Sequence, residues 1–377
     1  MVQNCISPDK AKCIYFSRFL PSIERGGGSR RLLQVFSELE AINCLLISSA
    51  RGDILPQNKL HSINTKRIKL LMKGEYFKWS KQKRDDVYRL RAISNFWAHK
   101  IDTFRQLRLA VVDDPIYFAP LVKKFKHRGI PVIASCHNLE TVVPDQIVQS
   151  HQQTLLRKEL ELLSYCQLII TISREETILL KNLNMETFYL PYYPIDEIQN
   201  RLMKIRECRE GIPQKKHLLL IGNARNIATR KGMLKLIQFW KTQHLSTDSN
   251  KLLIAGYATD IFLNTILSDN SIQFLGPLTN TEYDELLKSV KACICYQESG
   301  SGALTRICEM LVAGIPVVAN MHAARSYFHI DGVIEFSELI DLENALQAIN
   351  EQGSFIPIPQ RPETLRLRSN LANFLAT

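Results

Sequence analysis

Long apolar runs are missing from this chain of 377 residues. The longest, at residues 218–221 and 311–312 with their neighbours, are far shorter than the ~20 residues with which a helix crosses a bilayer. The first residues of the chain also lack the apolar centre of a signal peptide. We therefore expect a cytoplasmic protein without membrane-spanning helices.

Cysteine spacings typical of a metal site are also missing, although the chain has nine cysteines. Cys293 and Cys295 are separated by one residue of an alternating strand, where a pair of zinc ligands is not expected. Most of the other cysteines lie within apolar segments, where a small buried thiol is the usual role. The sequence therefore predicts no disulfides and no metal site, which is typical of a reducing compartment.

Acidic residues are fewer than basic ones, with 37 Asp and Glu against 48 Lys and Arg, and the net charge is +11. The excess is concentrated at residues 66–91, where basic side chains alternate with Tyr76, Phe77, Trp79 and Tyr88. A solvated helical surface explains such a segment, and so does docking on an anionic membrane or a phosphate-bearing acceptor. We expect no nucleic acid as a partner, because no recognised nucleic-acid-binding module surrounds the segment.

The most informative stretch that is present lies at residues 300–319, where a glycine-rich turn precedes a helix and a buried strand. Helical spacing over 304–313 places Arg306 and Glu309 on one face, and the helix ends before the strand at 317–319. Backbone N–H groups at the start of such a helix point to an anion, and a carboxylate further along accepts hydrogen bonds from hydroxyls. The pattern suits a nucleotide sugar, with diphosphate at the turn and ribose at Glu309. An ordinary turn with a solvated Glu309 is the alternative.

Short β-rich runs alternate with helical segments along the chain, which is typical of parallel sheets with crossover helices. The alternation stops near residue 190 and restarts near residue 215. We therefore predict an α/β protein with two Rossmann-like domains facing a central cleft. The expected divisions are a first domain at 1–190, an interdomain linker at 191–214, a second domain at 215–355 and, at 356–377, a tail helix that packs back on the first domain.

A set of short motifs follows one order along the chain. These are Gly26-Gly27-Gly28, His137-Asn138, the strand end at 171–175, the turn at 190–195, Ile221-Gly222 with Lys231-Gly232, Phe274-Leu275-Gly276, and the segment 300–316. In this order they resemble the retaining glycosyltransferases of GT-B architecture, in the family called group 1 or family 4. The resemblance covers nearly the whole length.

The resemblance implies transfer of a sugar from a nucleoside-diphosphate sugar to an acceptor hydroxyl, with retention at the anomeric carbon and without a metal or another cofactor. No Asp-x-Asp pair lies in a plausible donor loop, since Asp113 and Asp114 are adjacent and belong to the first domain. The acceptor would be a glycan or a lipid-linked molecule in polysaccharide or glycolipid synthesis. Residues 66–91 would then contact the inner membrane face peripherally.

By their place in the family's motifs, Arg225 and Lys231 would neutralise the donor diphosphate, with Arg230 as a competing candidate. Glu309 would bind the ribose hydroxyls. The other positions implied on the donor side are Asn223, Ser301, Gly302, Ala303, Leu304 and Arg306. In the first domain, Gly27 and Gly28 would let the backbone approach the transferred sugar, and His137 would lie beside it.

The chain departs from the family at two positions. The family has two glutamates separated by seven residues, and Ser301 stands where the first is expected. Glu298, three positions earlier, is a candidate to reach the sugar, so the candidate catalytic residues are His137, Glu298 and Ser301. Asn223 stands where the family often has arginine. The alternative function is therefore a catalytically weak or silent sugar-nucleotide-binding protein of the same fold.

Overall fold

The computed structural model describes residues 11–39, 42, 44–49, 77–212, 214–243, 251–266, 270–351 and 356–376. Its contacts divide the chain into two units. The first unit is Met1–Pro191 together with Pro362–Thr377, and the second is Tyr192–Arg361. Within the described residues, no helix combines the length and the apolar composition needed to cross a membrane.

The first unit is built on a parallel sheet of six strands in the order β2-β1-β3-β4-β5-β6. The strands are β1 (Cys13–Ser17), β2 (Cys44–Ser48), β3 (Leu109–Asp113), β4 (Val132–Cys136), β5 (Leu168–Thr171) and β6 (Thr187–Tyr189). Because β1 has β2 on one side and β3 on the other, the order reverses between β1 and β3. Ligands of open α/β sheets bind at the carboxyl ends of the strands at such a point.

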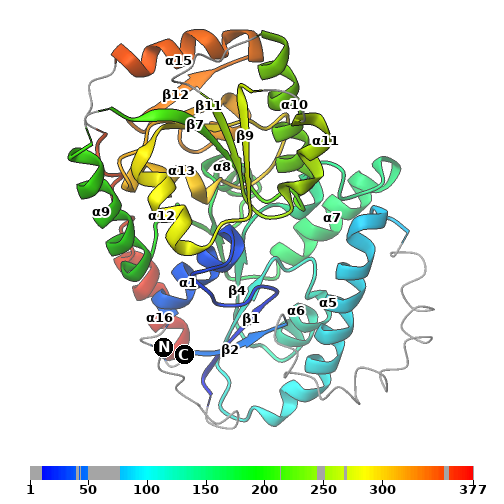
Figure 1. The fold of residues 1–377 in the computed structure, drawn as a ribbon. Helices are drawn as coiled ribbons and strands as arrows, with labels where there is room; N and C mark the ends of the chain where they lie inside the picture. The colour runs from blue at the N-terminus through cyan, green and yellow to red at the C-terminus, as the bar shows by residue number, and fades with distance from the viewer. Residues whose placement is uncertain are drawn as a thin grey trace. The chain divides into compact units, whose positions relative to one another are not determined.

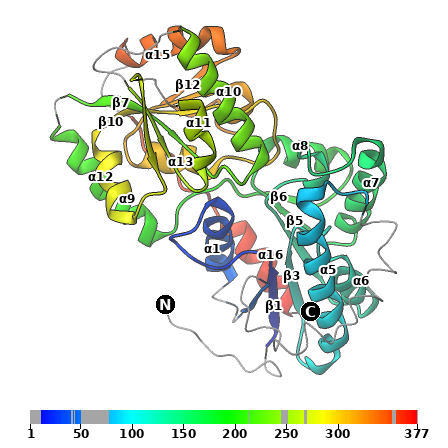
Figure 2. The same ribbon diagram turned by 45° about the vertical axis from the view of Figure 1, so that its right-hand side comes forward.

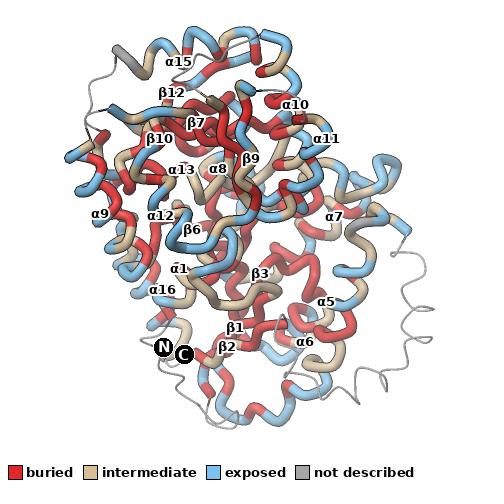
Figure 3. Tube along the Cα trace, viewed as in Figure 1, coloured by how far each residue is buried: buried red, intermediate tan, exposed pale blue. Residues whose placement is uncertain are grey.

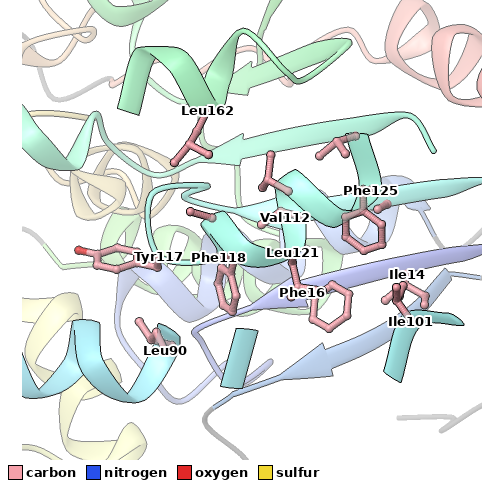
Figure 4. Packing of buried hydrophobic residues seen from close by; sticks show 14 of the residues in the cluster. Ile14, Phe16, Leu90, Ile101, Val112, Tyr117, Phe118, Leu121, Phe125 and Leu162 are labelled. Carbon is pink, nitrogen blue, oxygen red and sulfur yellow. The ribbon is translucent and has the colours of Figure 1, made fainter. Parts of the chain in front are cut away.

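Helices cover both faces of this sheet. They are α1 (Gly27–Leu39), α5 (Lys81–Lys100), α6 (Ala119–His127), α7 (Gln152–Leu163), α8 (Arg174–Asn182) and α16 (Leu365–Ala376). Side chains alternate along β1, so that Ile14 and Phe16 face α5 and α6 while Cys13 and Tyr15 face α1 and α16. Figure 4 shows Phe16 packed with Phe118 and Phe125 on the first of these faces.

The C-terminal helix α16 belongs to the first unit, far from its neighbours in the sequence. It lies beside α1 in both ribbon views, with α16 in red and α1 in blue (Figure 1 and Figure 2). Leu367 and Leu371 are buried in one cluster with Leu32 and Val35 of α1. The sheet face covered by α1 is therefore completed by the last residues of the chain.

The second unit has its own parallel sheet, in the order β12-β11-β10-β7-β8-β9. The strands are β7 (Lys216–Ile221), β8 (Leu252–Ala255), β9 (Ile272–Gly276), β10 (Val290–Cys295), β11 (Val317–Asn320) and β12 (Val333–Phe336). The order reverses between β7 and β10, which is the arrangement of a Rossmann fold. Strands β8 and β11 are buried along their whole length and β10 along most of it, and the middle of this sheet is accordingly red in Figure 3, whereas β7, β9 and β12 also have exposed residues.

The helices of the second unit are α9 (Asp196–Glu210), α10 (Ile227–Gln243), α11 (Leu263–Ile266), α12 (Asn280–Ser289), α13 (Thr305–Val312), α14 (Met321–Ala324) and α15 (Leu342–Glu351). Helices α10 and α15 pack on one face of the sheet through a cluster that includes Leu236 and Trp240. Helix α9 packs against α12 and α13.

The segment 191–214, expected to be an interdomain linker, consists mostly of helix α9, and from Tyr192 onward it belongs to the second unit. Its polar composition has a structural use, because Arg206 and Arg209 are buried and donate to backbone carbonyls. Arg206 reaches the carbonyls of Leu311 and Val312 at 2.5 and 2.9 Å, at the end of α13. Carbonyls at a helix end lack partners within the helix, and a guanidinium satisfies several at once.

Candidate functional site

The loops that follow β7 and β10 meet at the point where the strand order of the second unit reverses. Arg306, in the first turn of α13, donates to the carbonyl of Ile221 at the end of β7 and lies 3.4 Å from the hydroxyl of Thr229 in α10. The sequence predicted that Arg306 contacts the substrate. In the structure its guanidinium has these protein partners, which tie α13 to β7 and α10, and the contact with substrate stays a prediction.

Helix α10 passes very close to the loop after β10. A Cβ atom added at Gly232 would lie 2.1 Å from the carbonyl oxygen of Tyr296, far inside van der Waals contact. Only glycine permits this approach. The first turns of α10 and the loop at 296–304 are therefore held against each other by backbone contact.

Three basic residues gather at the start of α10. Asn226 caps this helix, accepting the N–H of Thr229 at 3.0 Å. Arg225 is exposed and stacks on Tyr257 at 4.7 Å, Lys231 is exposed, and Arg230 is half-buried. Asn223 is also exposed, and its side chain accepts the N–H of Arg225 at 3.0 Å. The positive end of the helix dipole and these cations together favour an anion here.

The glycine-rich loop leads to a second helix start nearby. Leu304 occupies the N-cap position of α13 and supplies no side-chain cap. Asn320 at the end of β11 holds the base of this loop, since it accepts the N–H of Gln297 at 3.0 Å and donates to its carbonyl at 2.7 Å. Asn320 was not predictable from the sequence, because no local pattern connects it with a loop 23 positions earlier.

Glu298 and Ser301, two of the candidate catalytic residues, lie in this loop. Glu298 is exposed and forms an ion pair with Lys235 of α10, with 2.5 Å between Oε1 and Nζ. The carbonyl of Ser301 accepts a hydrogen bond from Arg325 at 2.8 Å. The structure therefore pairs the carboxylate of Glu298 with a cation at the surface of the unit.

Glu309 is buried inside the second unit, with only 2% of the residue exposed. One of its carboxylate oxygens accepts a hydrogen bond of 2.7 Å from the hydroxyl of Tyr192. The alternative of a solvated Glu309 is wrong. A buried carboxylate with a fixed donor has a defined orientation, which a hydrogen-bonding role requires.

His137 of the first unit follows β4 and is held by two buried carboxylates. Its Nε2 atom lies 3.5 Å from Oδ1 of Asp113, and its backbone N–H donates to Asp114 at 2.9 Å. Burial acts to raise the pKa of Asp113, but His137 and the hydroxyls of Ser17 and Tyr15 outweigh it and hold this pKa below its usual value. Asp113 is therefore an ionised partner of His137.

Gly27 and Gly28 begin helix α1, and one aromatic ring joins them to His137. A Cβ atom at Gly28 would lie 2.3 Å from the ring of Phe19. The same ring packs on the imidazole of His137, with 4.6 Å between centroids. The glycine turn and His137, more than a hundred positions apart in the sequence, thus contact one side chain.

A buried charge cluster lies beside His137, since Asp114 contacts both His137 and Arg18, and no local sequence pattern indicated this cluster. Glu140 is fully buried, and its carboxylate contacts Arg18 at 2.6 Å and Lys83 at 3.5 Å. Tyr117 also donates to it at 2.5 Å. Burial alone would raise the pKa of Glu140, but Arg18 and Lys83 lower it to about 2. Arg18 directly follows β1, Lys83 belongs to α5 and Tyr117 lies between β3 and α6, so only the folded chain brings them together.

Acidic, histidine and cysteine side chains do not gather in a metal-binding group anywhere in the described residues. Figure 1 locates the two places described above, at the starts of α10 and α13 in one unit and of α1 in the other.

Comparisons with known proteins bear on the fold. No protein-family model and no curated relative matches the sequence. Solved structures do match, over nearly the whole of both chains. Sucrose-phosphate synthase from Thermosynechococcus elongatus is 14% identical, with a TM-score of 0.61 and coverage of 97% of this chain and 94% of that one.

TarM is 11% identical over 99% of this chain and 100% of its own, with a TM-score of 0.61. HepE from Anabaena, in complex with UDP, is 13% identical over 97% and 99%, with a TM-score of 0.62. This chain has the GT-B fold. The predicted class of two Rossmann-like domains is confirmed by these matches and by the two parallel sheets.

Proposed function

We propose that this protein is a glycosyltransferase that moves a sugar from a nucleoside-diphosphate sugar to an acceptor hydroxyl, with retention at the anomeric carbon. One observation carries the proposal. Two helix starts, a group of cations and the buried Glu309 converge where the strand order of the second sheet reverses. Support also comes from HepE, which has the same fold and has been solved with UDP-glucose.

In this proposal the charge that develops on the leaving diphosphate is stabilised by groups already in place. Arg225, Lys231 and the first N–H groups of α10 and α13 supply positive potential there. Glu309 accepts hydrogen bonds from the ribose hydroxyls. Neither a metal nor another cofactor is required for this stabilisation. Arg230 remains the competing candidate for the phosphate contact.

The first unit would supply the groups beside the transferred sugar. His137, oriented by Asp113 and Asp114, presents an imidazole at the carboxyl ends of the strands. Gly27 and Gly28 keep the start of α1 free of side chains. The acceptor is a glycan or a lipid-linked molecule, which places the enzyme in polysaccharide or glycolipid synthesis.

The test is a thermal-shift panel of UDP-, GDP- and ADP-sugars, followed by an assay for slow hydrolysis of the stabilising donor. Stabilisation with hydrolysis supports a transferase. Stabilisation without hydrolysis supports the alternative of a silent sugar-nucleotide binder, which Ser301 and Asn223 motivate. Absence of stabilisation by every nucleotide sugar would overturn both.

We further propose that the enzyme works in the cytoplasm at an anionic membrane surface. Residues 66–76 of the basic segment lie outside the described residues, but 77–91 are described. Phe77 is 54% exposed, and the guanidinium of Arg84 lies 5.2 Å from its ring. Lys81 is exposed nearby. An exposed aromatic ring among cations suits the interface of an anionic membrane.

Vesicle co-sedimentation tests this second proposal. The protein should sediment with vesicles of phosphatidylserine and phosphatidylcholine, and much less with phosphatidylcholine alone. The double variant Phe77→Ser with Lys81→Glu should lose that preference. Equal sedimentation of the variant and the parent protein would contradict membrane docking by this surface.

A further inference from the structure

Arg325 directly follows α14 and reaches back across the second unit to the glycine-rich loop. Its Nε donates to the carbonyl of Gly302 at 2.8 Å, and one terminal nitrogen donates to the carbonyl of Ser301 at 2.8 Å. The other terminal nitrogen donates to the side chain of Gln297 at 2.9 Å and to the carbonyl of His322. One planar guanidinium therefore holds two successive carbonyls of the loop.

These two hydrogen bonds fix the orientation of the peptide groups that follow each carbonyl. In a trans peptide the C=O of one residue and the N–H of the next point in opposite directions. The N–H groups of Gly302 and Ala303 are therefore directed away from Arg325. Both precede α13, whose N-cap Leu304 supplies no side-chain cap.

The position of Arg325 is itself well defined. Asn320 caps α14 by accepting the N–H of Ala323 at 3.2 Å, and the same side chain holds the backbone of Gln297. The base of the loop and the helix that directly precedes Arg325 therefore share one anchor. A Cβ atom at Gly300 would lie 2.8 Å from a terminal nitrogen of Arg325, so the absence of a side chain there admits the guanidinium.

We infer that Arg325 is a positioning residue for diphosphate binding: it orients the N–H groups of Gly302 and Ala303 toward the phosphates without touching them. The inference rests on the proposed function. The positioning role of Arg325 goes beyond the proposed function, because Arg325 belongs to none of the motifs that suggested a nucleotide sugar. A lysine keeps the charge but has no planar fork, so it cannot hold both carbonyls in this geometry.

The experiment measures the affinity for UDP and for inorganic pyrophosphate by calorimetry, in the full chain and in Arg325→Lys. We expect the dissociation constants of both ligands to rise about tenfold, which corresponds to the loss of one to two net hydrogen bonds. Hydrogen exchange of the free proteins should show faster exchange at 297–304 in the variant. Gly300→Ala, which displaces the guanidinium by contact, should reproduce both effects.

Arg209→Lys is the matched control. Arg209 also donates to backbone carbonyls of the second unit, including those of Leu287 at 2.6 Å and Val290 at 2.8 Å, but it does not hold the loop. The Arg209→Lys variant should melt at a lower temperature than the parent protein. Its dissociation constants for UDP and for pyrophosphate should stay within about twofold of the parent values. Gly211→Ala, where an added Cβ meets only an ordinary contact at 3.6 Å, is the control for Gly300→Ala.

The outcomes separate the inference from the proposed function. If the parent protein binds UDP and Arg325→Lys binds UDP and pyrophosphate equally well, the positioning role is wrong and the proposed function stands. A loss of affinity in Arg209→Lys as large as in Arg325→Lys would show a general effect of stability and would also overturn the inference. If the parent protein binds neither ligand, the proposed function fails together with the inference.

Discussion

The hydroxyl of Tyr192 lies 2.7 Å from a carboxylate oxygen of Glu309, and both side chains are buried within the second unit. Tyr192 is the first residue of that unit, and Glu309 lies in the second turn of α13. The hydrogen bond therefore ties the beginning of the unit to the helix that would bind the ribose. It also holds Glu309 in one orientation before any ligand arrives.

Tyr192→Phe should lower the free energy of unfolding of the second unit by about 1.5–3 kcal/mol, because a buried carboxylate loses a donor. Denaturant titration monitored by fluorescence measures this change. Tyr193→Phe is the control, since Tyr193 is also buried and its ring faces Arg361 at 6.0 Å. An equal loss in both variants would contradict a specific role of the Tyr192–Glu309 hydrogen bond.

Glu309→Ala and Lys231→Ala should each abolish sugar transfer while leaving the fold intact. The first removes the proposed acceptor for ribose hydroxyls, and the second removes a cation from the start of α10. Turnover with the donor found by the nucleotide-sugar panel, together with circular dichroism, measures both effects. Lys288→Ala, which breaks an ion pair with Glu285 elsewhere in the unit, should retain activity. Near-normal turnover in Glu309→Ala or Lys231→Ala would remove that residue from the site.

The stability of the first unit should fall as the pH drops below about 4.5. The pKa of Glu140 is about 2 in the folded protein, against an ordinary value of 4.5. A folded pKa below the unfolded one stabilises the fold above the unfolded pKa, and this stabilisation is lost as the pH falls toward 2. The shift corresponds to about 3 kcal/mol at neutral pH.

Glu140→Gln tests this assignment through chemical unfolding at several pH values. The variant should be less stable than the parent at pH 7, because Arg18 and Lys83 lose a shared carboxylate. The difference should shrink between pH 4.5 and pH 2. A difference that stays constant over this range would show that Glu140 does not titrate as the structure indicates.

Gly232→Ala should weaken both the stability of the second unit and its affinity for nucleotide. The new methyl group would have to displace α10 from the carbonyl of Tyr296. Neither the Cβ atom nor the carbonyl oxygen can move away by a side-chain rotation, because both are bonded directly to the backbone. Overpacking of this kind costs about 1–3 kcal/mol. Thermal unfolding with and without UDP measures the two effects. Unchanged stability would mean that the loop adjusts freely, contrary to the close contact described above.

The sequence predicted the two sheets because their strands are short, apolar and separated by turns or helices. It did not predict β6 (Thr187–Tyr189), since three residues are too few to show a period. It predicted an interdomain linker with some helix where α9 lies, because a helix that uses arginines to satisfy buried carbonyls has the composition of a solvated segment. Tertiary contacts decide whether a three-residue strand or a polar helix forms, and a local sequence pattern does not reveal these contacts.

In the candidate site, too, local patterns were predictable and tertiary contacts were not. The glycine turns and the apolar segments that precede them indicated where a ligand would bind. The side chains that hold these turns were not predictable, because their partners are far away in the sequence. Tyr192 and Glu309 are 117 positions apart, and Arg18 and Glu140 are 122 positions apart. Arg325 has an ordinary local context and contacts the loop only through the fold.

The contact between α1 and α16 has a consequence for synthesis on the ribosome. The part of the chain that leaves the ribosome first makes almost all of the first unit, but α16, which helps α1 to cover one face of the sheet, emerges only after the whole second unit. The second unit, contiguous from Tyr192 to Arg361, has all its strands and helices before that moment. Until α16 emerges, the nascent first unit therefore exposes the apolar surface that Leu367 and Leu371 later bury.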